Sequence, residues 1–177
     1  MLIVVPRRRW FDRRFQLGLP LDAFPEIIER LRGTPARLEE RTRSIPPPRL
    51  IQRFGGTWSI QENVGHLLDL EPLWTGRLDD FFQDATTLRT ADLNNRKTHE
   101  AGHNAQALDT LLVSFRSARM VFMTRLEGLS PSQLQRAALH PRLQQPMTVT
   151  DHCFFVAEHD DHHLARITEL LKTEAAV

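Results

Sequence analysis

The stretch that decides the fold is TVTDHCFFVAEHDDHHLARITELL, from Thr148 to Leu171. Its apolar residues recur at helical spacing, and His159 and His163 stand four residues apart within that pattern. At about 100° per residue, both imidazole rings fall on the apolar face, which must turn inward. Burying two imidazoles among aliphatic side chains is unfavourable unless their nitrogens find partners. A shared divalent metal ion is one such partner, and a hydrogen-bonded pair in the core is the alternative.

Proline and glycine divide the rest of the chain into further helical segments. The segment from Pro25 to about Ser44 is predicted to kink or split at Gly33-Thr34-Pro35. Further long helices are expected at 59–84, 105–126 and 149–173, with a short one from Pro131 and a long polar loop at 86–103. Four long helices without a convincing alternating strand predict an all-α protein, an up-down four-helix bundle.

Length and composition fit one domain, 21–177, preceded by a basic and aromatic arm, 1–20. The net charge of +1 gives no strong field toward nucleic acid or a membrane, so neither is expected as a partner. The arm could contact nucleic acid through its arginines, but we favour packing of its aromatic residues onto the body. One cysteine and no recognisable targeting or membrane segment predict a cytoplasmic protein.

A second histidine pair spells the zinc-peptidase motif H-E-x-x-H, with His99, Glu100 and His103. That chemistry needs a helix that presents both histidines to one cavity. The preceding DLNNRKT is turn-like, and Gly102 inside the motif costs about 1 kcal/mol of helix stability. Both rings would also point away from the core face of the following helix. We therefore interpret the motif as a coincidental match in a polar loop.

A third ligand for the pair in the last helix is offered by the second helix, at His66. His66 lies on a partly polar strip beside the apolar face, where a residue lining a cavity is expected. Glu62 stands one turn earlier and is a candidate base or supporting carboxylate. It is predicted to form a capping box with Ser59, with Thr57 as a competing cap.

Other polar residues of the last helix receive structural interpretations. His152 is two turns from His159, so core packing or a supporting hydrogen bond suits it. Cys153 is expected to pack as a small apolar residue. Glu158 and Asp160 point away from the histidine stripe and are expected in solvent.

The chain resembles the DinB/YfiT-like superfamily in two stretches, TWSIQENVGHLLDLEPLWTGRL and VTDHCFFVAEHDDHHLARI. A third stretch resembles the third helix of that superfamily, namely LLVSFRSARMVFMTRLEGL. The resemblance covers roughly 25–171 and implies a four-helix bundle with a three-histidine metal site. One ligand of that site comes from the second helix and two from H-x-x-x-H in the last. Carried onto this chain, the ligands are His66, His159 and His163, the residues that the helical wheels also select.

Three neutral imidazoles would leave one position of the metal ion open, as in a catalytic site. The resemblance implies a metal-dependent enzyme that transfers a low-molecular-weight thiol to a small electrophilic substrate. A metal-dependent hydrolase and a non-catalytic, stress-linked metal-binding protein are the alternatives. Imidazole ligands suit zinc or nickel, and iron as a further option. The resemblance, together with aromatic residues spread widely around the second helix, also predicts a homodimer; those residues include Trp74, Phe81 and Phe82.

Overall fold

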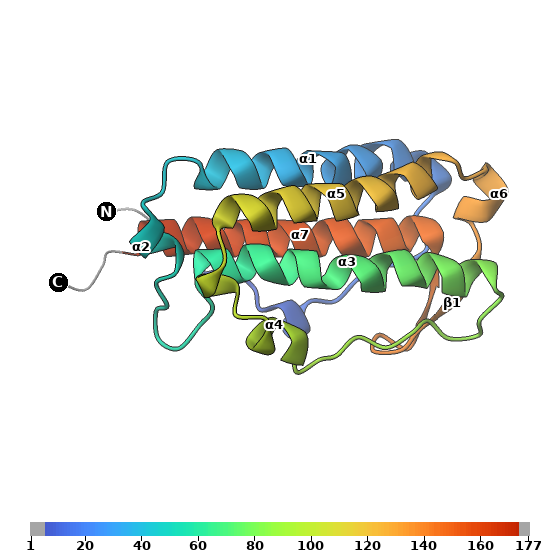
Figure 1. Ribbon diagram of the computed structural model, residues 1–177. Coiled ribbons are helices and arrows are strands. Elements are labelled where there is room, and N and C mark those ends of the chain that lie inside the picture. The colour runs from blue at the N-terminus through green and yellow to red at the C-terminus, as the bar shows by residue number, and fades with distance from the viewer. Residues whose placement is uncertain (1–5, 174–177) are drawn as a thin grey trace.

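Four long helices lie side by side in the computed structural model, which describes residues 6–173 (Figure 1). They are α1 (Phe24–Thr42), α3 (Ile60–Phe82), α5 (Leu108–Glu127) and α7 (Val149–Lys172). The all-α four-helix bundle is therefore confirmed. The first five residues of the predicted arm and residues 174–177 lie outside the described part. No helix within residues 6–173 is both long enough and apolar enough to cross a membrane.

A long crossover sets the direction of the helices. The chain leaves α3 and returns along the bundle before α5, so that α5 starts at the same end as α3 (Figure 1). As a result α1 and α7 run one way and α3 and α5 the other, so the helices do not alternate in direction along the chain as in the expected up-down order. The expected loop at 86–103 is not entirely irregular, because it contains α4 (Arg96–Glu100). Further short elements are α2 (Pro47–Leu50), α6 (Pro131–Leu134), and 3-10 turns at Trp10–Asp12, Leu21–Ala23 and His103–Ala105.

A small hairpin precedes α7. The sequence did not predict this hairpin. Strand β1 (Ala137–His140) pairs antiparallel with β2 (Gln145–Thr148), and Ala138 faces Met147 in the register. Each strand has four residues, too few for alternation to stand out from the neighbouring loop. The crossover adds to this hairpin through a bridge between Thr87 and Leu139.

Helix α1 continues through Pro35, where the sequence predicted a kink or a break. Proline has no N–H, so the carbonyl of Leu31, four residues earlier, loses its helical partner. The guanidinium of Arg119 on α5 fills that place, donating from Nη1 to the Leu31 oxygen at 3.1 Å. The expected break is absent because a neighbouring helix replaces the missing hydrogen bond.

The same arginine is the centre of a polar layer through the middle of the bundle. Arg119 donates to Glu71 on α3 and to Asp160 on α7, and Thr34 on α1 also donates to Asp160 at 2.8 Å. Apolar clusters fill the bundle on both sides of this layer. The expectation that Asp160 is solvated is wrong, because α1 and α3 both pack against α7 and leave it little solvent-facing surface.

Candidate metal centre

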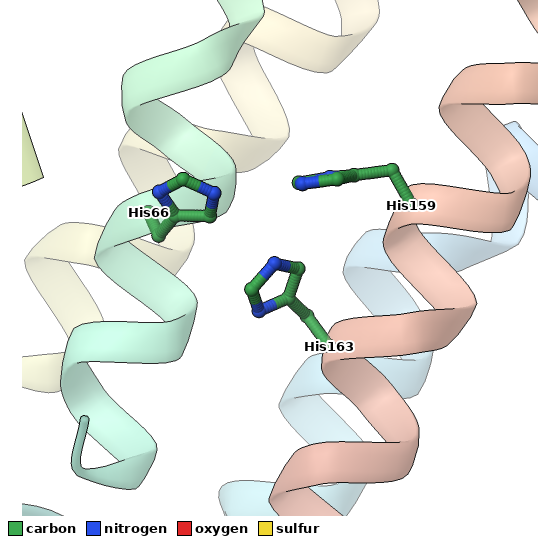
Figure 2. Close-up of side chains that lie close together, drawn as sticks. All are labelled: His66, His159 and His163. Carbon is green, nitrogen blue, oxygen red and sulfur yellow. The ribbon is translucent and has the colours of Figure 1, made fainter. Parts of the chain in front are cut away.

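Three histidines meet between α3 and α7. Figure 2 shows His66 on one helix facing His159 and His163 on the other. One nitrogen atom from each ring lies within 4.8 Å of the others, and the ring centroids are 4.6 to 5.3 Å apart. All three side chains are buried. The structure thus brings together the three residues that the sequence singled out.

Asn63 fixes the ring of His163. The Asn63 amide nitrogen donates to the carbonyl of Ser59 at 2.7 Å, so its Oδ1 atom faces the histidine. That oxygen can only accept, and it lies 2.8 Å from Nδ1 of His163. The proton of the neutral ring is therefore on Nδ1. The Nε2 atom keeps a free lone pair, as a metal ligand requires.

A longer chain of hydrogen bonds fixes His66. Its Nδ1 atom lies 2.9 Å from the hydroxyl of Thr98, and that hydroxyl donates its single proton to Asp69 at 2.9 Å. Thr98 must therefore accept from His66, which again leaves Nε2 unprotonated. Asp69 also contacts Nε2 of His103 at 2.8 Å. This Thr98–Asp69–His103 chain lies behind His66, where supporting partners of a metal ligand are found.

The structure separates the two histidines of the H-E-x-x-H motif. His99 is exposed on α4, whereas His103 is buried and packs its ring directly above Gly65 of α3. The interpretation of the motif as part of a polar loop is wrong for His103, because Asp69 and Gln106 both contact its buried ring. In the described part of the chain, this motif does not form a three-ligand cluster of its own.

Burial makes the three clustered imidazoles neutral. Desolvation lowers the pKa of His66 to about 4 and the pKa values of His159 and His163 well below the usual range. Neighbouring imidazoles also disfavour a positive charge on each of these rings. The Nδ1 atom of His159 is buried and has no hydrogen-bond partner among the described residues. The neutral form is the form of histidine that binds metal ions.

Glu62 lies apart from the cluster. It completes the expected capping box with Ser59, whose backbone N–H donates to Glu62 Oε2 at 2.9 Å. Arg53 donates to both oxygens of the same carboxylate. These bonds lower the Glu62 pKa against the opposing effect of burial, and Glu62 does not line the cavity beside the histidines. The geometry assigns it a role at the start of α3 and does not support a role as base.

A cavity of about 640 Å³ opens beside the three histidines. Ligand pockets in proteins have this range of volumes. The N-terminal arm and the crossover both contribute walls, so these two segments cover the site. The ring of Trp10 meets His159 at 4.9 Å between centroids, and Trp58 lies 4.6 Å from His66. The aromatic lining consists of Trp10, Phe11, Trp58, Trp74 and Phe155.

Three further residues of α7 lie outside the histidine cluster. His152 is fully buried in the core, and its Nε2 atom lies 3.1 Å from the Trp74 carbonyl. Cys153 packs in the apolar core as predicted, away from the cavity. Glu158 is not simply solvated, because it pairs with arginines of the arm and of α1.

The fold and this site define a helical-bundle protein with a buried three-histidine cluster at an aromatic-lined cavity. Residues 30–167 match the family model described as the DinB superfamily. The chain belongs to that superfamily, as the sequence resemblance indicated.

Similar proteins share this fold. YfiT from Bacillus subtilis, described as a probable metal-dependent hydrolase with an unusual four-helix bundle topology, superposes with a TM-score of 0.78 at 20% identity, over 89% of this chain and 91% of that one. A Bacillus pumilus (strain SAFR-032) protein named "Putative metal-dependent hydrolase" is 24% identical over 82% of this chain and 83% of its own.

Two other solved structures are more distant. A mycothiol-dependent maleylpyruvate isomerase superposes with a TM-score of 0.65 at 10% identity, over 85% of this chain and 62% of that chain. The colibactin self-resistance protein ClbS, in complex with double-stranded DNA, gives a TM-score of 0.66 at 17% identity, over 86% and 97%. At these identities the likeness shows the fold alone.

Proposed function

We propose that this protein is a metal-dependent enzyme in which His66, His159 and His163 bind one divalent ion. The observation that carries the proposal is the convergence of three neutral, buried imidazoles at a cavity. For two of them, hydrogen bonds to Asn63 and Thr98 leave Nε2 free. This donor set fits zinc or nickel, and iron as a further option.

We further propose that the reaction transfers a low-molecular-weight thiol to a small electrophile. A divalent ion held by His66, His159 and His163 would have an open position and would lower the pKa of a thiol bound there. The thiol proton passes to solvent, the sulfur forms a bond to an electrophilic carbon, and the leaving group departs with the electron pair of the bond that breaks. The chain's own Cys153 is buried away from the cavity, so this proposal takes the thiol from outside.

The acidic residues favour thiol transfer over hydrolysis. A metal-dependent hydrolase commonly uses a carboxylate to take a proton from water. Among the described residues that line the cavity, Asp92 is the one carboxylate, and its oxygens accept backbone N–H groups of Asn94 and Arg96. Glu62 is held by Arg53. A thiolate can attack without such a base.

A hydrolase is the second candidate, favoured by the names of the Bacillus pumilus relative and of YfiT. The test compares the metal-free protein with zinc- and nickel-loaded samples. Conjugation of 1-chloro-2,4-dinitrobenzene to 2-mercaptoethanol or cysteine, dependent on metal and lost with chelator, would support thiol transfer. Metal-dependent cleavage of nitrophenyl esters without thiol would favour the hydrolase. Metal binding with neither activity would favour a non-catalytic metal-binding protein.

We also propose a homodimer, but the aromatic residues of α3 no longer support it. Trp74 and Phe81 pack inside the chain, so their spread around α3 needs no partner. Exposed apolar residues of α5 offer another surface, namely Val113, Met120 and Val121. Sedimentation at micromolar concentration tests this proposal, and a monomeric mass would contradict it.

A further inference from the structure

We propose that Arg142 binds the negatively charged group of an organic anion, such as a carboxylate, inside the cavity. Arg142 lines the cavity and lies in the loop that joins β1 to β2. Among the described residues, no side chain or carbonyl accepts a hydrogen bond from its guanidinium. Its Nη2 atom is buried and finds no partner within residues 6–173. A buried donor of this kind needs an acceptor, which a bound ligand can supply.

The guanidinium is held in place without using its donors. Its Cζ atom lies 5.4 Å from the ring centroid of Phe11 and 5.9 Å from that of Phe155. The backbone is fixed as well, because the N–H groups of Arg142 and Leu143 both donate to Nδ1 of His140 at 3.2 Å. An arginine positioned by aromatic rings can still present its N–H groups to a carboxylate in a bidentate arrangement.

The other arginines of the cavity already have partners. Arg7 and Arg166 both pair with Glu169. Arg77 donates to the carbonyl of Arg89 at 3.1 and 3.2 Å. Arg142 differs from these three in having no acceptor among the described residues.

The balance of charge around the cavity favours an anion. Asp92, the one carboxylate among the described lining residues, is turned toward backbone N–H groups. Burial lowers the pKa of Arg142, and it lowers the pKa of Arg77 to about 10. A bound anion would relieve the cost of burying these positive charges.

The side chains that line the cavity indicate the chemical character of the rest of the ligand. Five aromatic side chains line the same cavity, so an apolar or aromatic body fits beside the charged group. The inferred substrate class is therefore a small organic anion with an apolar or aromatic body. This inference rests on the proposed function in one respect, namely that the cavity is the substrate site. The anion contact itself needs no metal ion.

The test uses the metal-free protein and two probes of similar shape, phenylacetate and its neutral amide, phenylacetamide. Binding is followed by tryptophan emission, since Trp10, Trp58 and Trp74 all line the cavity. A charge-assisted hydrogen bond corresponds to roughly tenfold to a hundredfold in affinity. We expect the wild type to prefer phenylacetate by about that factor. We expect Arg142→Gln to lose the preference and Arg142→Lys to recover part of it.

The matched control is Arg136→Gln, which removes an arginine near the same hairpin that pairs with Asp84 and does not line the cavity. It should keep the preference. Equal binding of the two probes by the wild type, no binding of either, or an unchanged preference in Arg142→Gln would overturn the inference. Metal content, measured on separate metal-loaded samples, shows independently whether the proposed function fails.

Discussion

The Nδ1 atom of His163 lies 2.8 Å from the Oδ1 atom of Asn63 on the facing helix. Because the Asn63 amide nitrogen is bound to the Ser59 carbonyl, this contact has one orientation and sets the tautomer of the histidine. Ser59 is the cap of α3 and begins the helix that also carries His66. The start of one helix therefore orients a proposed metal ligand on another.

Replacing Asn63 tests that relationship. In Asn63→Leu, Nδ1 of His163 has no acceptor, so the ring is free to change tautomer and orientation. We expect zinc affinity to fall about 10–100-fold, the usual effect of removing a partner behind a ligand. Competition with a chromophoric chelator measures the change. Asn63→Asp keeps an acceptor oxygen and should lose much less; an equal loss in both variants would contradict this role.

The contact between Gly65 and His103 predicts that Gly65→Ala has opposite effects on stability with and without the His103 ring. A Cβ atom on Gly65 would overlap the His103 ring, so Gly65→Ala should destabilise the protein and disturb Asp69. In a His103→Ala background the ring is gone, and the same change should stabilise the helix by up to about 1 kcal/mol. Urea denaturation of all four proteins measures this coupling. Additive effects would contradict the packing described.

The buried polar layer predicts a large effect on stability. Arg119→Met leaves two carboxylates, Glu71 and Asp160, buried without their cation, which typically costs about 3–5 kcal/mol. The control is Arg116→Met on the same helix, whose pair with Glu39 is exposed and worth at most about 1 kcal/mol. Chemical denaturation compares the two. A loss of less than about 1 kcal/mol for Arg119→Met would show that the layer does not stabilise the fold.

The buried cysteine predicts slow thiol chemistry. Burial raises the pKa of the Cys153 thiol because a thiolate there would lose its hydration. The thiol therefore stays protonated at neutral pH, and a disulfide reagent should react only after denaturant is added. Cys153→Ala should keep metal-dependent conjugation, since the reacting thiol comes from outside. Rapid labelling of the native protein, or loss of activity in the alanine variant, would contradict this assignment.

The bundle and its three histidines could be predicted because both depend on helical spacing. The separation of His159 and His163 by four residues fixes a shared face. The apolar stripe around them indicates that this face turns inward. His66 followed from its position beside the apolar face of its own helix. These signals are local, and the family resemblance agreed with them.

Features that depend on contacts between distant segments could not be predicted in this way. Asp160 looked solvated on its own helix, and its burial depends on the packing of α1 and α3 against α7 and on the guanidinium of Arg119 from α5. His103 looked like a loop residue because its partners, Gly65 and Asp69, are far away in the sequence. The spacing of Gly65, His66 and Asp69 within one helix carried a signal, since a glycine there leaves room for a neighbouring ring.

The most direct test of the central claim is the metal content of purified variants. After chelation and reloading with zinc, elemental analysis of the wild type should find about one ion per chain. His66→Ala, His159→Ala and His163→Ala should each lose most of it. His99→Ala, which removes an exposed histidine of the peptidase-like motif, should keep it. If His99→Ala lost the metal while His159→Ala retained it, the three-histidine assignment would be wrong.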